Sequence, residues 1–172
     1  MAAKKVSRRS PAKAAKSAAR KPTAASKRPA AARSKSRSAP AGLRAVKIVA
    51  KDAPGSMANH VYPFAQGWRL GNLVFTGGIA AEDPKTGKLA GSDIVTQSER
   101  VFQTLKAILE EAGSSLDKVL KVNVFFVDFA DKAGFETVYG KYFPKNRPGR
   151  TSMTVTKIGH GTLLELDAIA YV

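Results

Sequence analysis

Residues 147–155 read RPGRTSMTV, a proline–glycine turn that leads into a strand-like run, and this stretch decides how the chain is expected to fold. Side chains of a strand point alternately to its two faces. Arg150 therefore shares a face with Ser152, whereas Met153 and Val155 turn the other way, where we expect apolar packing. The position of Arg150 becomes informative once the last strand of the chain is placed beside it.

That last strand is expected over residues 163–170, LLELDAIA, running antiparallel to the Arg150 strand. One of its faces consists of leucine and alanine, and the other carries Glu165, Asp167 and Ile169. We therefore expect one guanidinium and two carboxylates to face the same way. A strand on the solvated surface would show similar charges, and this alternative stays open.

Residues 119–127, VLKVNVFFV, also read as a strand, and this run is apolar on both faces. The sheet is therefore expected to have a second buried surface. In so short a domain, another copy of the chain is the expected cover. Arg150 and Glu165 would then lie in or beside a subunit interface, and a plain ion pair between them is the structural alternative to a functional site.

The remaining pattern predicts the element order β-β-β-α-β-α-β-β. A weak first strand is expected over 46–49, and two further strands flank a Gly-Asn turn at 71–72. Apolar residues at helical spacing over 93–112 and 131–143 predict two helices. The expected fold class is α+β, a mixed sheet with both helices on one face.

The charge of the chain is concentrated at its N-terminus. The 172 residues have a formal net charge of +16, and residues 1–44 contain no acidic residue. We predict a disordered tail over 1–45 and a folded domain over 46–172, because the tail is too poor in large apolar residues to offset the entropy of ordering. Its function is either simple solvation or non-specific binding to DNA or RNA phosphates. An organelle transit peptide is less favoured, because Lys and Pro are abundant.

Composition excludes several classes of site. The chain has no cysteine, so it has no disulfide, thiolate nucleophile or Cys-based zinc site. His60 and His160 are isolated in the sequence, which argues against a His-rich metal centre. No apolar run approaches the ~20 residues of a transmembrane helix, and the N-terminus lacks the apolar core of a secretory signal, so we expect none. We expect a cytoplasmic protein without a membrane partner, and the basic tail would allow association with a nucleoid.

Several motifs, in the same order and nearly without gaps over 46–172, closely resemble the Rid family, also called YjgF or endoribonuclease L-PSP. The resemblance implies a chorismate-mutase-like fold and a homotrimer with three clefts between subunits. It also implies hydrolysis of reactive 2-imino and enamino acids to 2-keto acids and ammonia, with no metal or organic cofactor. The motifs that carry it include Leu70-Gly71-Asn72, Thr76-Gly77-Gly78, Asp83-Pro84-Lys85-Thr86-Gly87, Pro148-Gly149-Arg150-Thr151 and the run from Glu165 to Ala170.

The resemblance implies catalytic roles for Arg150 and Glu165. Arg150 would hold the carboxylate of a 2-imino acid through a bidentate, charge-assisted pair. Glu165 would orient or deprotonate the attacking water. Asp167, two residues further on, would raise the pKa of this carboxyl pair by repulsion, with help from burial.

The substrate-binding positions implied by the resemblance differ in part from those of active deaminases. Where those enzymes carry a tyrosine, a serine, an asparagine and a cysteine, this chain has Phe64, Gly77, Glu136 and Ser152, and Gly78 is the fifth expected substrate-binding position. The tyrosine hydroxyl is lost, and Glu136 adds a negative charge near a carboxylate site.

The alternative function is therefore a non-catalytic small-molecule-binding trimer that its basic tail tethers to nucleic acid. Trimerisation would triple the charge of the tails and strengthen this attachment through avidity. Ribonuclease activity is less favoured, because the sequence shows no arranged His, Lys and Glu constellation for phosphodiester cleavage.

Overall fold

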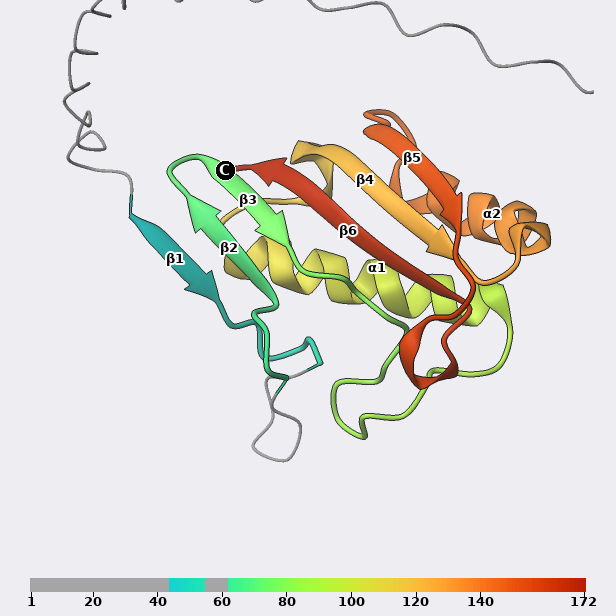
Figure 1. Cartoon of the computed structure of the whole chain (residues 1–172). Helices are drawn as coiled ribbons and strands as arrows, with labels where there is room; N and C mark the ends of the chain where they lie inside the picture. The colour runs from blue at the N-terminus through green and yellow to red at the C-terminus, as the bar shows by residue number, and fades with distance from the viewer. Residues whose placement is uncertain (1–43, 55–61) are drawn as a thin grey trace, which may run out of the picture. The chain divides into compact units, whose positions relative to one another are not determined.

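The computed structural model describes residues 44–54 and 62–172. The predicted tail, residues 1–45, lies outside the described residues except for its last two positions. The predictions that this tail is disordered and binds nucleic acid therefore fall outside the described residues as well. The described elements follow the predicted order (Figure 1): β1 (Ala45–Ile48), β2 (Gly67–Leu70), β3 (Leu73–Thr76), α1 (Ile94–Glu111), β4 (Val119–Phe126), α2 (Lys132–Tyr142), β5 (Gly149–Thr154) and β6 (Leu164–Tyr171).

The strands form one mixed sheet in the order β1-β2-β3-β6-β4-β5. All neighbours are antiparallel except β4 and β5, which are parallel. β5 and β6 run in opposite directions, as predicted, but β4 lies between them. The strand of Arg150, β5, and the last strand, β6, therefore both pair with β4, and β5 forms an edge of the sheet.

Both helices lie on the same face of the sheet (Figure 1). α1 begins after Asp93, whose carboxylate accepts a hydrogen bond from the Thr96 backbone N–H at 2.9 Å, and it ends before Gly113, which has a φ of +80°. The core is formed where the helices meet the apolar face of β4 and β6. Its fully buried side chains include Phe102, Leu105, Leu109, Val122, Val124, Phe126, Phe135, Leu164 and Leu166.

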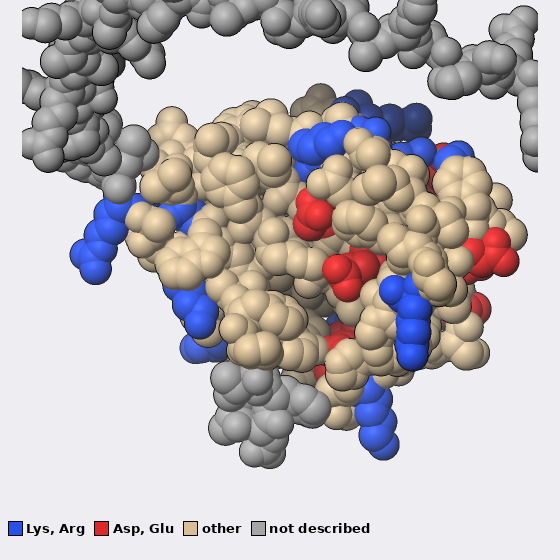
Figure 2. Space-filling model, viewed as in Figure 1, with Lys and Arg blue, Asp and Glu red and all other residues tan. Residues whose placement is uncertain are grey.

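The sheet face turned away from the helices, here called the open face, remains partly exposed. Strand register places Trp68, Phe75, Phe125 and Ile169 on it, and Trp68 is 45% exposed. Met153 shares this face and is 42% exposed, so the prediction that it packs against apolar neighbours is wrong for the single chain. Figure 2 shows the open face as largely uncharged, with acidic side chains near its centre.

Candidate functional site

Five of the seven residues assigned from the sequence line one of two cavities. One cavity of about 360 Å³ is lined by Phe64, Gly78 and Glu165, among others. A second, of about 370 Å³, is lined by Glu136 and Arg150 together with Tyr139, Gly140, Arg147 and Pro148. Gly77 and Ser152 line neither of these two cavities. The structure therefore distributes five of the assigned residues over two separate cavities, here called half-sites.

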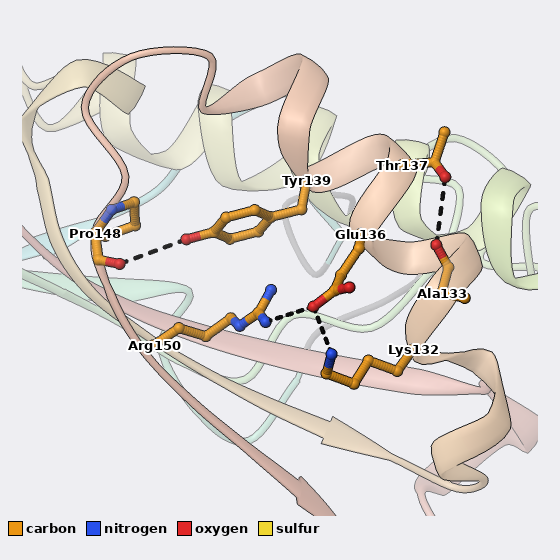
Figure 3. A network of polar contacts seen from close by, with 7 residues as sticks. All are labelled: Lys132, Ala133, Glu136, Thr137, Tyr139, Pro148 and Arg150. Carbon is orange, nitrogen blue, oxygen red and sulfur yellow. Dashed lines mark hydrogen bonds and ion pairs between the residues drawn. The ribbon is translucent and has the colours of Figure 1, made fainter.

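Arg150 reaches from β5 toward α2 (Figure 3). Its Nη2 lies 2.7 Å from Oε1 of Glu136, and its guanidinium carbon lies 4.9 Å from the centroid of the Tyr139 ring. Stacking on an aromatic face suits the planar guanidinium and fixes its orientation. The Tyr139 hydroxyl in turn points toward the Pro148 carbonyl oxygen, 3.5 Å away, at the turn that precedes Arg150. The guanidinium is therefore held in place from two sides.

Glu136 forms an ion pair with Arg150 and so occupies one side of its guanidinium. The same oxygen, Oε1, also accepts a hydrogen bond from Lys132 Nζ at 2.6 Å. The hydrogen bond from Lys132 lowers the pKa of Glu136 the most, and the hydrogen bond from Arg150 lowers it further. Glu136 is therefore ionised at neutral pH and already neutralises part of the Arg150 charge.

Glu165 projects from β6 on the open face and is partly buried. Burial raises its pKa above the ordinary value, and repulsion from Asp167 raises it further. For Glu165 this direction agrees with the prediction, although burial is the larger cause. Asp167 itself accepts a hydrogen bond from the Asn123 side-chain amide at 2.7 Å. Of the two carboxylates, Glu165 lines the cavity and Asp167 does not.

The paired glycines after β3 leave room for close contacts. A Cβ on Gly78 would lie 2.8 Å from Cδ of Glu165, so the carboxyl group packs directly against the Gly78 backbone. A Cβ on Gly77 would lie 2.8 Å from the Ala65 carbonyl oxygen. The Gly77 N–H also donates to the Gln66 carbonyl oxygen at 2.8 Å. A larger residue at either position requires its surroundings to move.

Phe64 lies on the rim of the Glu165 cavity, where its ring stacks on Tyr62 with centroids 4.9 Å apart. Gln66, two residues further along the chain, connects this segment to the residues that follow β1. Its side-chain oxygen accepts from the Ala50 N–H at 2.7 Å, and its amide donates to the Pro54 carbonyl oxygen at 2.8 Å. Phe64 supplies an apolar surface to the cavity and no hydroxyl.

The expectation that Arg150 and Glu165 share a face is wrong for a single chain. Arg150 pairs with Val122 of β4, which also pairs with Ala168, and these residues face the helices. Glu165 pairs with Phe125, which lies on the open face. The alternation within each strand was predicted correctly. The relation between the strands depends on the register of β4, which lies between them.

Most residues that line the Glu165 cavity were not predicted from the sequence, among them the polar residues Glu82, Thr104 and His160. Glu82 precedes the Asp83-Pro84 turn, a signal that predicts solvent exposure, yet it is buried. Thr104 sits in an apolar helix pattern where a single hydroxyl carries no signal. Within residues 44–54 and 62–172, no helix is long and apolar enough to cross a membrane.

Comparison with known proteins supports one family. The family model described as Endoribonuclease L-PSP matches residues 53–172. A RutC family protein of Pyrococcus abyssi is 41% identical over 109 residues, which cover 63% of this chain and 86% of that protein.

Solved structures agree in fold. RidA from an Antarctic Psychrobacter species is 32% identical with a TM-score of 0.68, covering 74% of this chain and 99% of that one. The Escherichia coli protein TdcF, solved with bound serine, is 32% identical with a TM-score of 0.67, covering 74% and 98%. These likenesses confirm the predicted mixed sheet with two helices. The chain therefore belongs to the Endoribonuclease L-PSP family, which includes the Rid proteins that its motifs resemble.

Proposed function

We propose that the chain hydrolyses reactive 2-imino and enamino acids to 2-keto acids and ammonia, in clefts between the subunits of a homotrimer. Each cleft would combine Arg150 of one subunit with Glu165 of the next. The observation that carries this proposal is the pair of half-sites. Within one chain the cation and the carboxylate lie on opposite faces of the sheet, so a single site that uses both needs a second copy.

The open face favours such an assembly. Its exposed large apolar side chains form a surface of the kind that marks protein–protein contacts. Glu165 and Asp167 lie within this face, and Arg150 lies on the edge strand β5 beside α2. Packing the edge of one copy against the open face of another would bring the second half-site to the first. The exposed apolar residues concerned are Trp68, Leu70, Leu73, Phe75, Met153 and Tyr171.

The chemistry of the two half-sites fits imine hydrolysis. Arg150 would hold the substrate carboxylate by a charge-assisted pair. Water then adds to the imine carbon as Glu165 accepts its proton, and this proton passes to the nitrogen. The resulting carbinolamine loses ammonia as its C–N bond breaks, and its hydroxyl proton leaves with the nitrogen. A raised pKa makes the ionised Glu165 a stronger base than an ordinary carboxylate.

The relatives support a small carboxylate ligand. TdcF was solved with serine, an amino acid that carries a carboxylate. The test is release of keto acid or ammonia from freshly generated 2-iminopropionate and 2-iminobutyrate, with the Arg150→Ala and Glu165→Gln variants compared with the wild type. Acceleration over the spontaneous rate that both variants lose supports the proposal. No acceleration by the wild-type trimer would reject this reaction for these substrates.

The distribution of charge favours a second candidate function, a small-molecule-binding trimer that its tail tethers to nucleic acid. Residues 1–44 contain 14 of the 29 Lys and Arg residues and no Asp or Glu. Binding through phosphate neutralisation weakens steeply as salt rises. A salt-dependent mobility shift of DNA or RNA by the full chain, absent for a chain of residues 46–172, would support tethering. A shift that persists without the tail would reject it.

A further inference from the structure

The cavity beside Glu165 is lined by a second carboxylate, Glu82, that the proposed reaction does not use. Glu82 lines this cavity and is only 4% exposed, although carboxylates are rarely buried without good partners. Within the described part of the chain, its ion-pair partner is Nδ1 of His160, 3.5 Å from Oε1. This distance exceeds that of an ordinary hydrogen bond, and the His160 side chain is 68% exposed. Glu82 therefore remains a buried acceptor with spare capacity.

A second buried polar group lines the same cavity. Thr104, on α1, is 2% exposed, and its hydroxyl has no hydrogen-bond partner among the described residues. Thr104 lines the cavity together with Glu82. Buried polar atoms are normally paired, so two under-satisfied groups around one cavity indicate a ligand that brings hydrogen-bond donors. A hydroxyl can accept such a bond as readily as it donates one.

The charge and the shape of the cavity define that donor further. Glu165 adds a second carboxylate, and His160 is the one basic side chain among the described residues that line the cavity. The rest of the wall is largely apolar, with Ile79 and Ile108 on it. The volume of about 360 Å³ lies in the range of about 300–1,000 Å³ typical of small-molecule sites. An aliphatic stem that ends in a cation matches both properties.

We propose that this cavity binds an alkyl ammonium or alkyl guanidinium group, with the cation on Glu82 and Thr104 and the stem along the apolar wall. In combination with the proposed function, on which this step rests, the preferred substrate is a 2-imino acid with a basic side chain. Its carboxylate lies on Arg150 of one subunit, its imine carbon beside Glu165 of the next, and its side-chain cation on Glu82. The cation displaces the long contact from His160.

The direct test measures binding and does not depend on catalysis. The full-length wild-type protein is titrated with n-pentylammonium and with 1-pentanol, followed by NMR chemical shifts of the backbone amides around Gly78. We expect pentylammonium to bind at least about tenfold more tightly than pentanol, because a hydrogen bond to a charged group is stronger than a neutral one. Glu82→Gln keeps the shape of the side chain and removes its charge, and it should abolish this preference.

Two further variants make the result specific. Glu110→Gln makes the same chemical change at an exposed carboxylate outside the cavity, and it should retain the preference of the wild type. His160→Asn suits the left-handed backbone at this position, where φ is 58°, and it should tighten pentylammonium binding by removing the competing imidazole. If Glu82→Gln does not fold, the His160 variant still tests the proposal. Equal affinity for the two probes in the wild type would overturn it, as would a preference that survives in Glu82→Gln.

Activity then separates this inference from the proposed function. In the wild type, kcat/KM should be higher for the imino acid generated from arginine than for the one generated from norleucine. The ratio of these two values should fall about tenfold in Glu82→Gln. Cation binding without any imine hydrolysis would leave the subsite standing and reject the deaminase. Hydrolysis that shows no preference for the basic side chain would retain the deaminase and reject the subsite.

Discussion

Arg150 and Glu165 lie on opposite faces of one sheet, because Arg150 is registered with Val122 on the helix side and Glu165 with Phe125 on the open side. Subunits that lack one of these residues should therefore complement each other. When Arg150→Ala and Glu165→Gln chains are co-expressed and assemble at random, about a quarter of the clefts between subunits combine both intact residues. We expect keto-acid release at roughly that fraction of the wild-type rate.

The matched comparison is co-expression of wild-type chains with chains that carry both substitutions. Random mixing then yields the same statistical fraction of intact clefts, so the two preparations should agree in rate. A preparation of complementary single variants that stays as inactive as each variant alone would place the site within one chain and contradict the proposed clefts. Sedimentation of each preparation confirms that mixed trimers have formed.

The sequence predicted those features of the fold that depend on local pattern. Alternation in residues 163–170 and helical spacing over 93–112 are properties of short stretches, and the elements form where these patterns place them. The relation of Arg150 to Glu165 could not be predicted in this way. It depends on β4 lying between their strands, and therefore on the pairing of residues that are far apart in the chain. Glu82 was missed for a similar reason, since His160, which contacts its carboxylate, lies far away in the chain.

Removal of the Glu136 charge should strengthen the binding of carboxylates. Glu136 contacts Arg150 at 2.7 Å and would compete with a carboxylate ligand for the same guanidinium. We expect Glu136→Gln to bind pyruvate, a simple 2-keto acid product, roughly threefold to tenfold more tightly, a modest change because the ion pair is partly exposed. Calorimetric titration of wild type and variant measures the difference.

Glu99→Gln is the matched control for this experiment. It breaks a different ion pair between the two helices, the one with Lys141 at 2.7 Å, and leaves Arg150 untouched. Its pyruvate affinity should equal that of the wild type. Weaker binding by Glu136→Gln would mean that Glu136 holds Arg150 in its productive position and does not compete with the ligand.

Gly78→Ala should lower activity with little loss of stability. The added methyl group would meet the Glu165 carboxyl group, and the end of a flexible side chain can move aside without disturbing the core. We expect kcat to fall at least about tenfold if Glu165 has the proposed catalytic role, because displacement of a catalytic group by about 1 Å costs much of its effect. The melting temperature should fall by only a few degrees, roughly the effect of 1 kcal/mol or less.

The thermal control is Gly140→Ala, since a Cβ at this helical position meets nothing within 4 Å. Alanine in a helix interior is favoured over glycine by about 1 kcal/mol, so this variant should melt at a slightly higher temperature. If Gly78→Ala instead lowers the melting temperature as much as a core mutation does, the close contact at Gly78 maintains the fold. Its effect on the position of Glu165 would then be secondary.

The raised pKa of Glu165 predicts how the stability of the protein depends on pH. In the folded chain its pKa lies above the ordinary value of 4.5, because burial and Asp167 disfavour the ionised form. A folded state with the higher pKa binds the proton more tightly than the unfolded state does. The protonated Glu165 therefore contributes its full stabilisation below about pH 4.5, and this contribution is lost as the pH rises through the folded pKa.

Glu165→Gln cannot ionise and should melt at a higher temperature than the wild type at pH 7, with the gap closing at pH 4. Thermal unfolding at both pH values measures this gap, and Glu110→Gln, at an exposed carboxylate, should show no such gap. A Glu165→Gln protein that is less stable than the wild type at pH 7 would mean that the ionised carboxylate has a stabilising partner, such as Arg150 of the neighbouring subunit, and that the trimer satisfies a charge that the single chain leaves strained.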